Sequence, residues 1–130
     1  MVQSFQLGSS GMLNLDTHIL IHALEGKLTA IENKLLSEDS WSISAIVLWE
    51  ISKLKQHNKI HLDIHSADFG RALSKIRIWP LDWAVCLQAI QMDFESDPAD
   101  ELIAATSVVH RIPLVTRDQK LRRSKMVPIA

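Results

Sequence analysis

Acidic side chains recur beside the apolar segments of this chain, in positions from which they could share one pocket. They are Asp16, Glu50, Asp97, Asp100 and Asp118. Two carboxylates about 4 Å apart repel each other by roughly 4 kcal/mol at an effective dielectric of 20, so such a cluster requires protonation or a divalent cation. Oxygen ligands of this kind suit Mg²⁺ or Mn²⁺. A metal site of this composition is suited to hydrolysis of a phosphodiester by an activated water molecule.

The same acids also have a purely structural interpretation. Aspartate before a helix caps backbone N–H groups, and an acid in the first turn interacts favourably with the helix dipole. Taken singly, Asp16, Asp97 and Asp100 fit this structural role better than that of a metal ligand. Spacing alone therefore leaves both roles open.

The pattern of apolar residues predicts short strands that alternate with helices. The expected strands are 13–15, 41–43, 76–81 and 114–116, and the expected helices are 17–25, 28–36, 45–55, 63–75, 83–92 and 99–110. This alternation predicts an α/β domain with a mainly parallel central sheet flanked by helices. Asp16 and Asp118 then follow strand ends, where ligand sites of open parallel sheets gather.

The composition is that of one compact domain. The chain has 130 residues, 47% of them hydrophobic, and a formal net charge of -1, which excludes a strongly basic nucleic-acid coat protein. Its single cysteine, Cys86, cannot form an internal disulfide, so we expect a reducing, cytoplasmic location. Acidic residues interrupt the longest apolar segments, which leaves none long enough to span a bilayer, and we expect no membrane association.

Residues 1–11 are polar, contain two glycines near their end, and lack the features of a secretory signal. We interpret them as an extension or tag, and we expect the folded domain to comprise residues 12–130.

Four blocks of sequence, in their order and separation, resemble PIN-domain proteins, and within that superfamily the VapC-type toxins of bacterial toxin-antitoxin pairs. The blocks are LNLDTH at 13–18, SAIVLWEI at 44–51, DPADELIAAT at 97–106 and LVTRD at 114–118. The resemblance extends from Met12 to about Val127 and implies a single PIN-like nuclease domain.

The resemblance also implies an endoribonuclease that depends on Mg²⁺ or Mn²⁺. Asp16 and Asp100 would be direct metal ligands, and Glu50 and Asp118 would bind the metal or orient its waters. Supporting roles would fall to Asp97, Thr116, Thr17 and Ser44. Glu101 replaces an arginine that is frequent in relatives, and no long final strand is evident, but neither departure removes a ligand.

The resemblance further implies a cognate antitoxin that covers the acidic pocket, an RNA substrate, and a homodimer, for which apolar helices such as 30–36 could supply an interface. Basic side chains near the end of the chain could contact RNA phosphates. They are Arg117, Lys120, Arg122 and Arg123. A solvated terminal segment and an antitoxin surface are alternative interpretations of the same residues.

Two other functions are weighed against the toxin. One is a PIN nuclease that acts in RNA maturation. The other, from a different class, is a magnesium-binding receiver module of phosphate signalling, which also gathers acids at strand ends but requires a phosphorylatable aspartate and a lysine partner that this chain does not evidently have.

For the histidines and tryptophans, a structural role is favoured over a role in binding. His57, His61 and His65 would form a zinc-binding stripe only on one continuous helix, and the intervening Asn58 and Asp63 predict a break. His18, close to Asp16, is a weaker candidate for a substrate contact, and with His22 it is expected to form a pair on a helix surface. Packing is expected for all four tryptophans, with base stacking as the alternative. They are Trp41, Trp49, Trp79 and Trp83.

Overall fold

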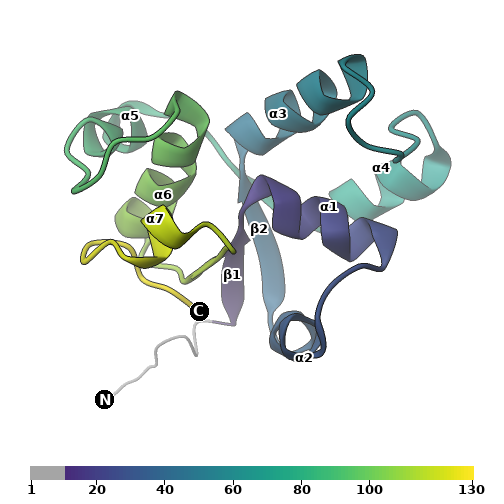
Figure 1. The fold of residues 1–130 in the computed structure, drawn as a ribbon, viewed down its shortest axis with the longest axis horizontal. Coiled ribbons are helices and arrows are strands. Elements are labelled where there is room, and N and C mark those ends of the chain that lie inside the picture. Colours follow the sequence, from purple (N-terminus) through teal and green to yellow (C-terminus); the bar gives the residue numbers. More distant parts are fainter. Residues whose placement is uncertain (1–10) are drawn as a thin grey trace.

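The structure is a computed structural model that describes residues 11–130 (Figure 1). Its strands are β1 (Met12–Leu15), β2 (Ser40–Ser44), β3 (Arg77–Trp79) and β4 (Leu114–Val115). Its helices are α1 (Thr17–Glu25), α2 (Ala30–Ser37), α3 (Ala45–Gln56), α4 (Ala67–Ser74), α5 (Trp83–Ala89), α6 (Pro98–His110) and α7 (Gln119–Arg122). Apart from Gly11, the predicted extension lies outside the described residues.

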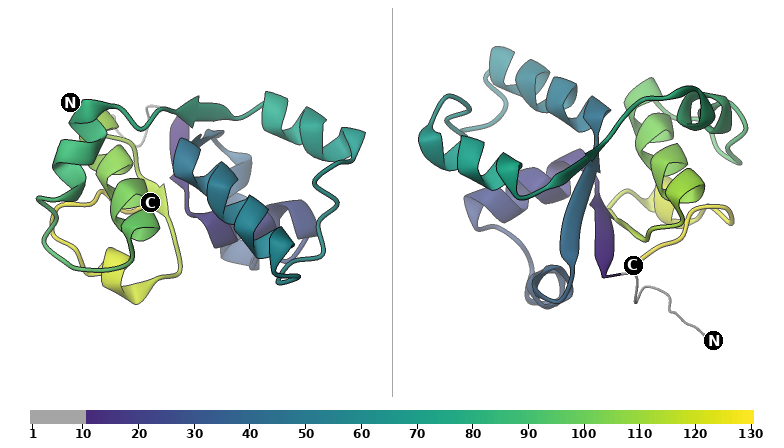
Figure 2. Two further views of the ribbon diagram at one scale, coloured as in Figure 1. Left: turned by 90° about the horizontal axis from the view of Figure 1, so that it is seen from above. Right: turned by 180° about the vertical axis from the view of Figure 1, so that it is seen from behind.

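All four strands form one parallel sheet in the order β3-β2-β1-β4. This confirms the predicted α/β class. The helices form two groups, with α1 to α4 on one side of β1 and α5 to α7 on the other (Figures 1 and 2). Because parallel strands end at the same edge of a sheet, Asp16 after β1 and Thr116 after β4 lie at one edge.

The central strands are buried because helices cover them. Leu13, Leu15, Ile43 and Leu114 on the strands are at most 2% exposed, as expected for a parallel sheet whose faces are both covered. The helices contribute equally buried side chains to the same core, among them Ile19, Leu20, Val47 and Ile103. Burial of this apolar surface provides the main driving force for folding.

One polar side chain interrupts this core. Asn14 in β1 is fully buried, and its Nδ2 donates to the carbonyl oxygen of Ile103 at 3.1 Å and to Oγ of Ser107 at 2.9 Å. Both acceptors belong to α6. The amide therefore holds β1, which leads to Asp16, against the helix that carries Asp100.

Several predicted element boundaries were wrong, and local capping explains them. The fourth helix starts at Ala67 rather than residue 63, because Oγ of Ser66 accepts the N–H of Phe69 at 3.1 Å and Asp63 forms a turn instead. The second helix starts at Ala30 behind a capping box of Thr29 and Glu32. Strand β3 ends before Pro80, which cannot donate to the sheet. The fifth helix ends at residue 89, not 92, and the sequence did not predict α7.

The predicted break after the third helix is confirmed. Helix α3 ends at Gln56, and Asn58 adopts a left-handed backbone conformation with φ of 56°. His57, His61 and His65 therefore do not share one continuous helix. Among residues 11–130, no helix is long and apolar enough to cross a membrane.

Candidate active site

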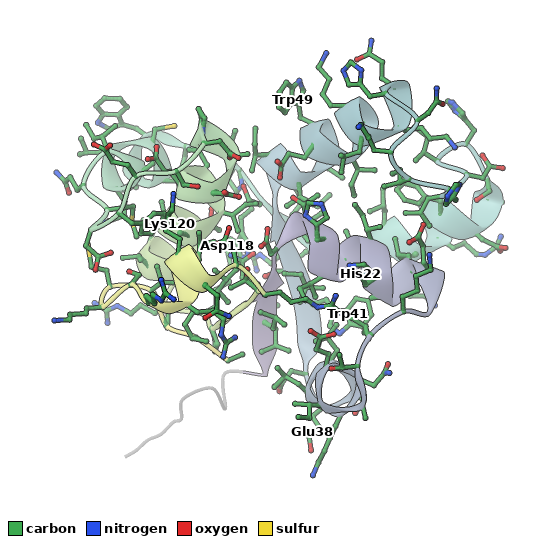
Figure 3. All side chains as sticks on the ribbon, in the orientation of Figure 1. His22, Glu38, Trp41, Trp49, Asp118 and Lys120 are labelled. Atoms are coloured by element: carbon green, nitrogen blue, oxygen red, sulfur yellow. The ribbon has the colours of Figure 1, made fainter. Side chains whose placement is uncertain are left out.

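The five acids singled out from the sequence line one open cleft of about 440 Å³ at the edge where the strands end. Asp118 lies between β4 and α7, near the end of β1, and His22 projects from α1 (Figure 3). The cleft is lined by Asp16, His18, Ile19, His22, Glu50, Asp97, Asp100, Arg117 and Asp118. The structure thus brings together acids that are separated by up to 102 positions in the chain.

Asp16 is the most buried of these acids, at 8% exposure. It caps α1: its Oδ1 accepts the N–H of Thr17 at 2.8 Å, and its Oδ2 accepts the hydroxyl of Thr116 at 2.6 Å. Burial raises its pKa above the ordinary value, although the hydrogen bonds from Thr116 and Thr17 oppose that rise. Both carboxylate oxygens are therefore fixed in direction while the group remains poorly solvated.

Glu50 projects into the cleft from α3, and its Oε1 accepts a hydrogen bond from the hydroxyl of Thr17. Burial raises its pKa, and the nearby carboxylates of Asp100, Asp16 and Asp97 raise it further. Ser44 does not line the cleft: it is fully buried and caps the helix that carries Glu50, with Oγ accepting the N–H of Ile46 at 3.3 Å. Thr17 thus holds the carboxylate of Glu50 directly, whereas Ser44 acts only by capping the helix that carries it.

Asp97 and Asp100 enter the cleft from the first turn of α6. Asp97 caps the helix by accepting the N–H of Asp100 at 3.0 Å, and Pro98 occupies the first turn, where its missing N–H costs nothing. Oδ2 of Asp100 accepts the hydroxyl of Ser96 at 2.7 Å. The pKa of Asp100 is raised by burial and by three neighbouring carboxylates, those of Asp97, Asp16 and Asp118.

The sequence analysis missed Ser96 and noted Glu101 only as a replacement for an arginine that is frequent in relatives. Ser96 precedes α6 and Glu101 lies in its first turn: Oε2 of Glu101 accepts the N–H of Ser96 at 3.2 Å, while Ser96 donates to Asp100. A serine four residues before an acid was the available signal. Glu101 therefore helps to hold Ser96 in place at the start of α6 and does not line the cleft.

Asp118 begins the short helix α7. Its Oδ1 accepts the N–H groups of Lys120 at 2.8 Å and Leu121 at 3.3 Å, and its own N–H donates to Oγ1 of Thr116 at 3.0 Å. Thr116 therefore contacts both Asp16 and Asp118 and holds the acids that follow the neighbouring strands β1 and β4.

The hydrogen bonds that the acids form within the protein leave carboxylate oxygens available for a cation. Each of four acids uses one carboxylate oxygen within the protein, and its second oxygen has no hydrogen-bond partner among residues 11–130. They are Glu50, Asp97, Asp100 and Asp118. Such oxygens suit Mg²⁺ or Mn²⁺, and a cation would relieve the mutual repulsion of these carboxylates. As the structure stands, no three His, Cys, Asp or Glu side chains in this described part are gathered closely enough to hold a metal.

Only one of the four predicted phosphate contacts lines the cleft. Arg117 does so, and its guanidinium donates to both carboxylate oxygens of Glu32. Nζ of Lys120 donates to the carbonyl oxygen of Glu95 at 2.9 Å, and Nη1 of Arg122 donates to that of Thr116 at 3.1 Å. Arg123 lines a separate shallow pocket with Lys120.

All four tryptophans were expected to serve packing, and two of them do. Trp41 donates from Nε1 to the carbonyl oxygen of Leu36 at 2.8 Å, and Trp79 stacks on His110 with ring centroids 3.9 Å apart. The expectation was wrong for Trp49 and Trp83, which are 56% and 76% exposed. Figure 3 shows Trp49 projecting from the outer side of α3.

The comparison with known families agrees with this arrangement. The PIN domain model matches residues 14–125, which include every acid of the cleft. The chain therefore belongs to the PIN-domain family. Among curated relatives, it is 32% identical over 87 residues to the protein named ribonuclease VapC22 of Mycobacterium tuberculosis (strain ATCC 25618 / H37Rv), covering 65% of this chain and 67% of the relative. Within the PIN-domain family, the chain is a homologue of the VapC ribonucleases.

Solved structures share the fold at low sequence identity. A toxin-antitoxin complex from Klebsiella pneumoniae matches with a TM-score of 0.65 at 22% identity, covering 85% of this chain and 90% of the other. VapBC2 from Rickettsia felis, bound to a promoter DNA fragment, matches with a TM-score of 0.66 at 20% identity, covering 92% and 97%. VapBC from Salmonella typhimurium, also bound to DNA, gives 0.62 at 20% identity, covering 92% and 96%.

Proposed function

We propose that this protein is the toxin of a toxin-antitoxin pair and acts as an endoribonuclease that depends on Mg²⁺ or Mn²⁺. The observation that carries the proposal is the convergence of five carboxylates, from four separate parts of the fold, on one open cleft. Such a concentration of negative charge opposes folding unless it serves a cation. The homology to ribonuclease VapC22 supports RNA as the substrate.

In this proposal Asp16, Glu50, Asp100 and Asp118 hold the cation, and Asp97 assists at the start of α6. When bound, the cation supplies Lewis-acid stabilisation of negative charge and lowers the pKa of a water molecule. Hydrolysis adds that water across one P–O bond of the RNA. Thr17, Ser96 and Thr116 keep one oxygen of Glu50, Asp100 and Asp16 fixed, respectively, which lowers the cost of ordering the site when substrate binds. Lys120, Arg122 and Arg123 are proposed as further, outer phosphate contacts.

The test is cleavage of total cellular RNA by purified, partner-free protein with Mg²⁺ or Mn²⁺, with EDTA as the metal-free arm. Asp100→Asn removes one cleft charge but retains an acceptor for Ser96, so it should abolish cleavage without loss of the fold. Asp68→Asn is the matched control, because Asp68 lies on α4, away from the cleft, and is 89% exposed. Cleavage that survives EDTA or Asp100→Asn would reject the proposed site.

A cognate antitoxin is the partner that we propose. Relatives with this fold have been solved as toxin-antitoxin complexes. Growth arrest on expression of the chain alone, relieved by coexpression of the neighbouring gene, would support a toxin. A nuclease of RNA maturation would not arrest growth in this way. The PIN-domain match gives no support to the receiver-like alternative.

A homodimer is also part of the proposal. Ile31 on α2, in the segment first considered as an interface, is 81% exposed, but it stands alone. Trp83 and Ile90, 76% and 80% exposed, lie two helical turns apart in and just after α5, with the partly exposed Leu87 between them. Sedimentation of Ile90→Glu and Ile31→Glu variants would identify which face, if either, mediates dimer formation.

A further inference from the structure

One ion pair at the mouth of the cleft stands apart from the acids already described. Nε of Arg117 donates to Oε2 of Glu32 at 2.8 Å, and Nη2 donates to Oε1 at 2.6 Å. The two residues are 85 positions apart: Glu32 lies in the first turn of α2, and Arg117 lies between β4 and α7. Paired, parallel hydrogen bonds of this kind fix the plane of a guanidinium as well as its position.

Arg117 has unused hydrogen-bonding capacity on its other edge. A guanidinium has five N–H donors, and Glu32 engages two of them, which leaves both N–H groups of Nη1 and one of Nη2. These three have no hydrogen-bond partner among residues 11–130, and the side chain is 44% exposed. The remaining edge is therefore free to bind an anion from solution.

In the proposed ribonuclease, the anion available to this edge is a phosphate of the RNA substrate. Arg117 is the only lysine or arginine among the described residues that line the cleft, and it shares that lining with five carboxylates. A phosphodiester that approaches five carboxylates is repelled, and an arginine at the mouth offsets part of that repulsion. Guanidinium groups bind phosphate oxygens through two parallel hydrogen bonds.

The same carboxylates would attract an unrestrained Arg117 into the cleft, where it would compete with a metal ion for their free oxygens. Glu32 acts from outside the cleft and is not among its lining residues. We infer that Glu32 is a positioning residue: by binding the Nε edge of Arg117 it holds the guanidinium at the mouth of the cleft, with the opposite edge presented to an RNA phosphate. This inference rests on the proposed ribonuclease function and extends it.

The strength of the ion pair supports this assignment. The hydrogen bonds from Arg117 lower the pKa of Glu32 to about 2, so the carboxylate is charged at every pH at which the enzyme could work. Glu32 also accepts the N–H of Thr29 through Oε1, at 2.9 Å, as part of the capping box of α2. One helix terminus therefore fixes the glutamate that fixes the arginine.

Two substitutions separate the ion pair from the capping box. Glu32→Gln keeps an acceptor for Thr29, because glutamine also completes a capping box, but it removes the charge that attracts Arg117. Thr29→Ala removes the threonine side chain from the box and leaves the ion pair. If Glu32 only stabilises α2, Thr29→Ala should change Tm, RNA affinity and KM more than Glu32→Gln does.

The experiment measures binding of a fluorescein-labelled, mixed-sequence oligoribonucleotide by anisotropy, in an Asp100→Asn background that prevents cleavage, together with steady-state kinetics in the otherwise native chain. We expect Arg117→Gln and Glu32→Gln each to weaken RNA binding and raise KM about tenfold with kcat nearly unchanged. Thr29→Ala should lower Tm but leave RNA affinity as it is. Arg117→Lys keeps the charge but not the paired geometry, so it should restore only part of the affinity.

Unchanged RNA affinity in Glu32→Gln, together with a loss of RNA affinity in Arg117→Gln, would overturn the positioning role of Glu32. Arg117 would then bind RNA equally well without the ion pair. Equal losses of affinity in Thr29→Ala and Glu32→Gln would likewise overturn it. The proposed function fails separately: if the native chain cleaves no RNA with Mn²⁺ while Glu32→Gln and Arg117→Gln still weaken oligoribonucleotide binding, the nuclease is rejected and the phosphate contact stands.

Discussion

The hydroxyl group of Thr116 donates a 2.6 Å hydrogen bond to Oδ2 of Asp16, and its own oxygen, Oγ1 of Thr116, accepts the backbone N–H of Asp118 at 3.0 Å. Asp16 follows β1, Thr116 follows β4, and these two strands are neighbours in the sheet. The threonine thus joins the two strand ends that present carboxylates to the cleft. Its hydrogen bond also favours the charged form of Asp16, in opposition to burial.

Thr116→Val should therefore impair the enzyme without unfolding it. Loss of the hydroxyl removes a hydrogen bond to a carboxylate, which is worth about 1.5–3 kcal/mol, so kcat/KM should fall at least about tenfold. The pKa of Asp16 should rise further, and the acidic limb of the pH profile of kcat/KM should move to higher pH. Thr116→Ser retains the hydroxyl and serves as the control. An unshifted profile in Thr116→Val would show that this contact does not set the charge of Asp16.

Neutralising a cleft acid should stabilise the metal-free protein. Glu50→Gln and Asp100→Asn keep acceptors for Thr17 and Ser96 but remove repulsion, and we expect a gain of about 0.5–2 kcal/mol in the free energy of unfolding at pH 7 in EDTA. Urea denaturation measures it. Asp68→Asn, at an exposed site on α4, should change stability by less than about 0.5 kcal/mol.

The pH dependence of that gain has a definite sign. In the folded protein the pKa values of Glu50 and Asp100 lie above their ordinary values of 4.5 and 3.8. A raised carboxylate pKa destabilises the folded state fully above the raised value, and the penalty disappears as the pH falls below the ordinary value. The stability difference between each variant and the native chain should thus be largest at neutral pH and vanish near pH 3. A difference that grows on acidification would contradict the assignment.

Metal addition should reverse the order of stabilities. Mn²⁺ binds the folded state, so at about 100 times its dissociation constant it should add roughly 2.7 kcal/mol to the native chain. Asp100→Asn should gain much less. Because protons compete for carboxylates whose pKa values are raised, the Mn²⁺-induced rise in Tm should weaken as the pH falls. An equal rise in Tm for Asp100→Asn and the native chain would place the metal elsewhere.

The parts of this molecule that the sequence could predict are those encoded locally. The first helix was expected at residues 17–25 and is found there, because Asp16 caps it and Gly26 ends it in a left-handed conformation. Helix α7 has four residues, too few to show a period. The pair of Glu32 and Arg117 spans 85 positions, so only the tertiary fold brings the two side chains together.

The roles of the acids illustrate the same limit. From the sequence, Asp97 taken singly fitted a helix cap better than a metal ligand, whereas the resemblance implied that Asp118 binds the metal or orients its waters. In the structure both cap helices through Oδ1, and their Oδ2 atoms have no hydrogen-bond partner among the described residues. A capping pattern in the sequence reports only the first of these oxygens, and where the second one points depends on the packing of separate elements.

The last prediction concerns the buried amide that holds the two halves of the site together. Asn14→Ala removes the hydrogen bonds to Ile103 and Ser107, whereas Oδ1 of Asn14 is buried and has no partner among the described residues. Loss of that orphaned acceptor should offset part of the damage, so we expect a net loss of about 1–3 kcal/mol in the free energy of unfolding. Ser107→Ala removes only one of the two bonds and should cost less. If Asn14→Ala proved neutral in urea denaturation, apolar packing alone would hold β1 against α6.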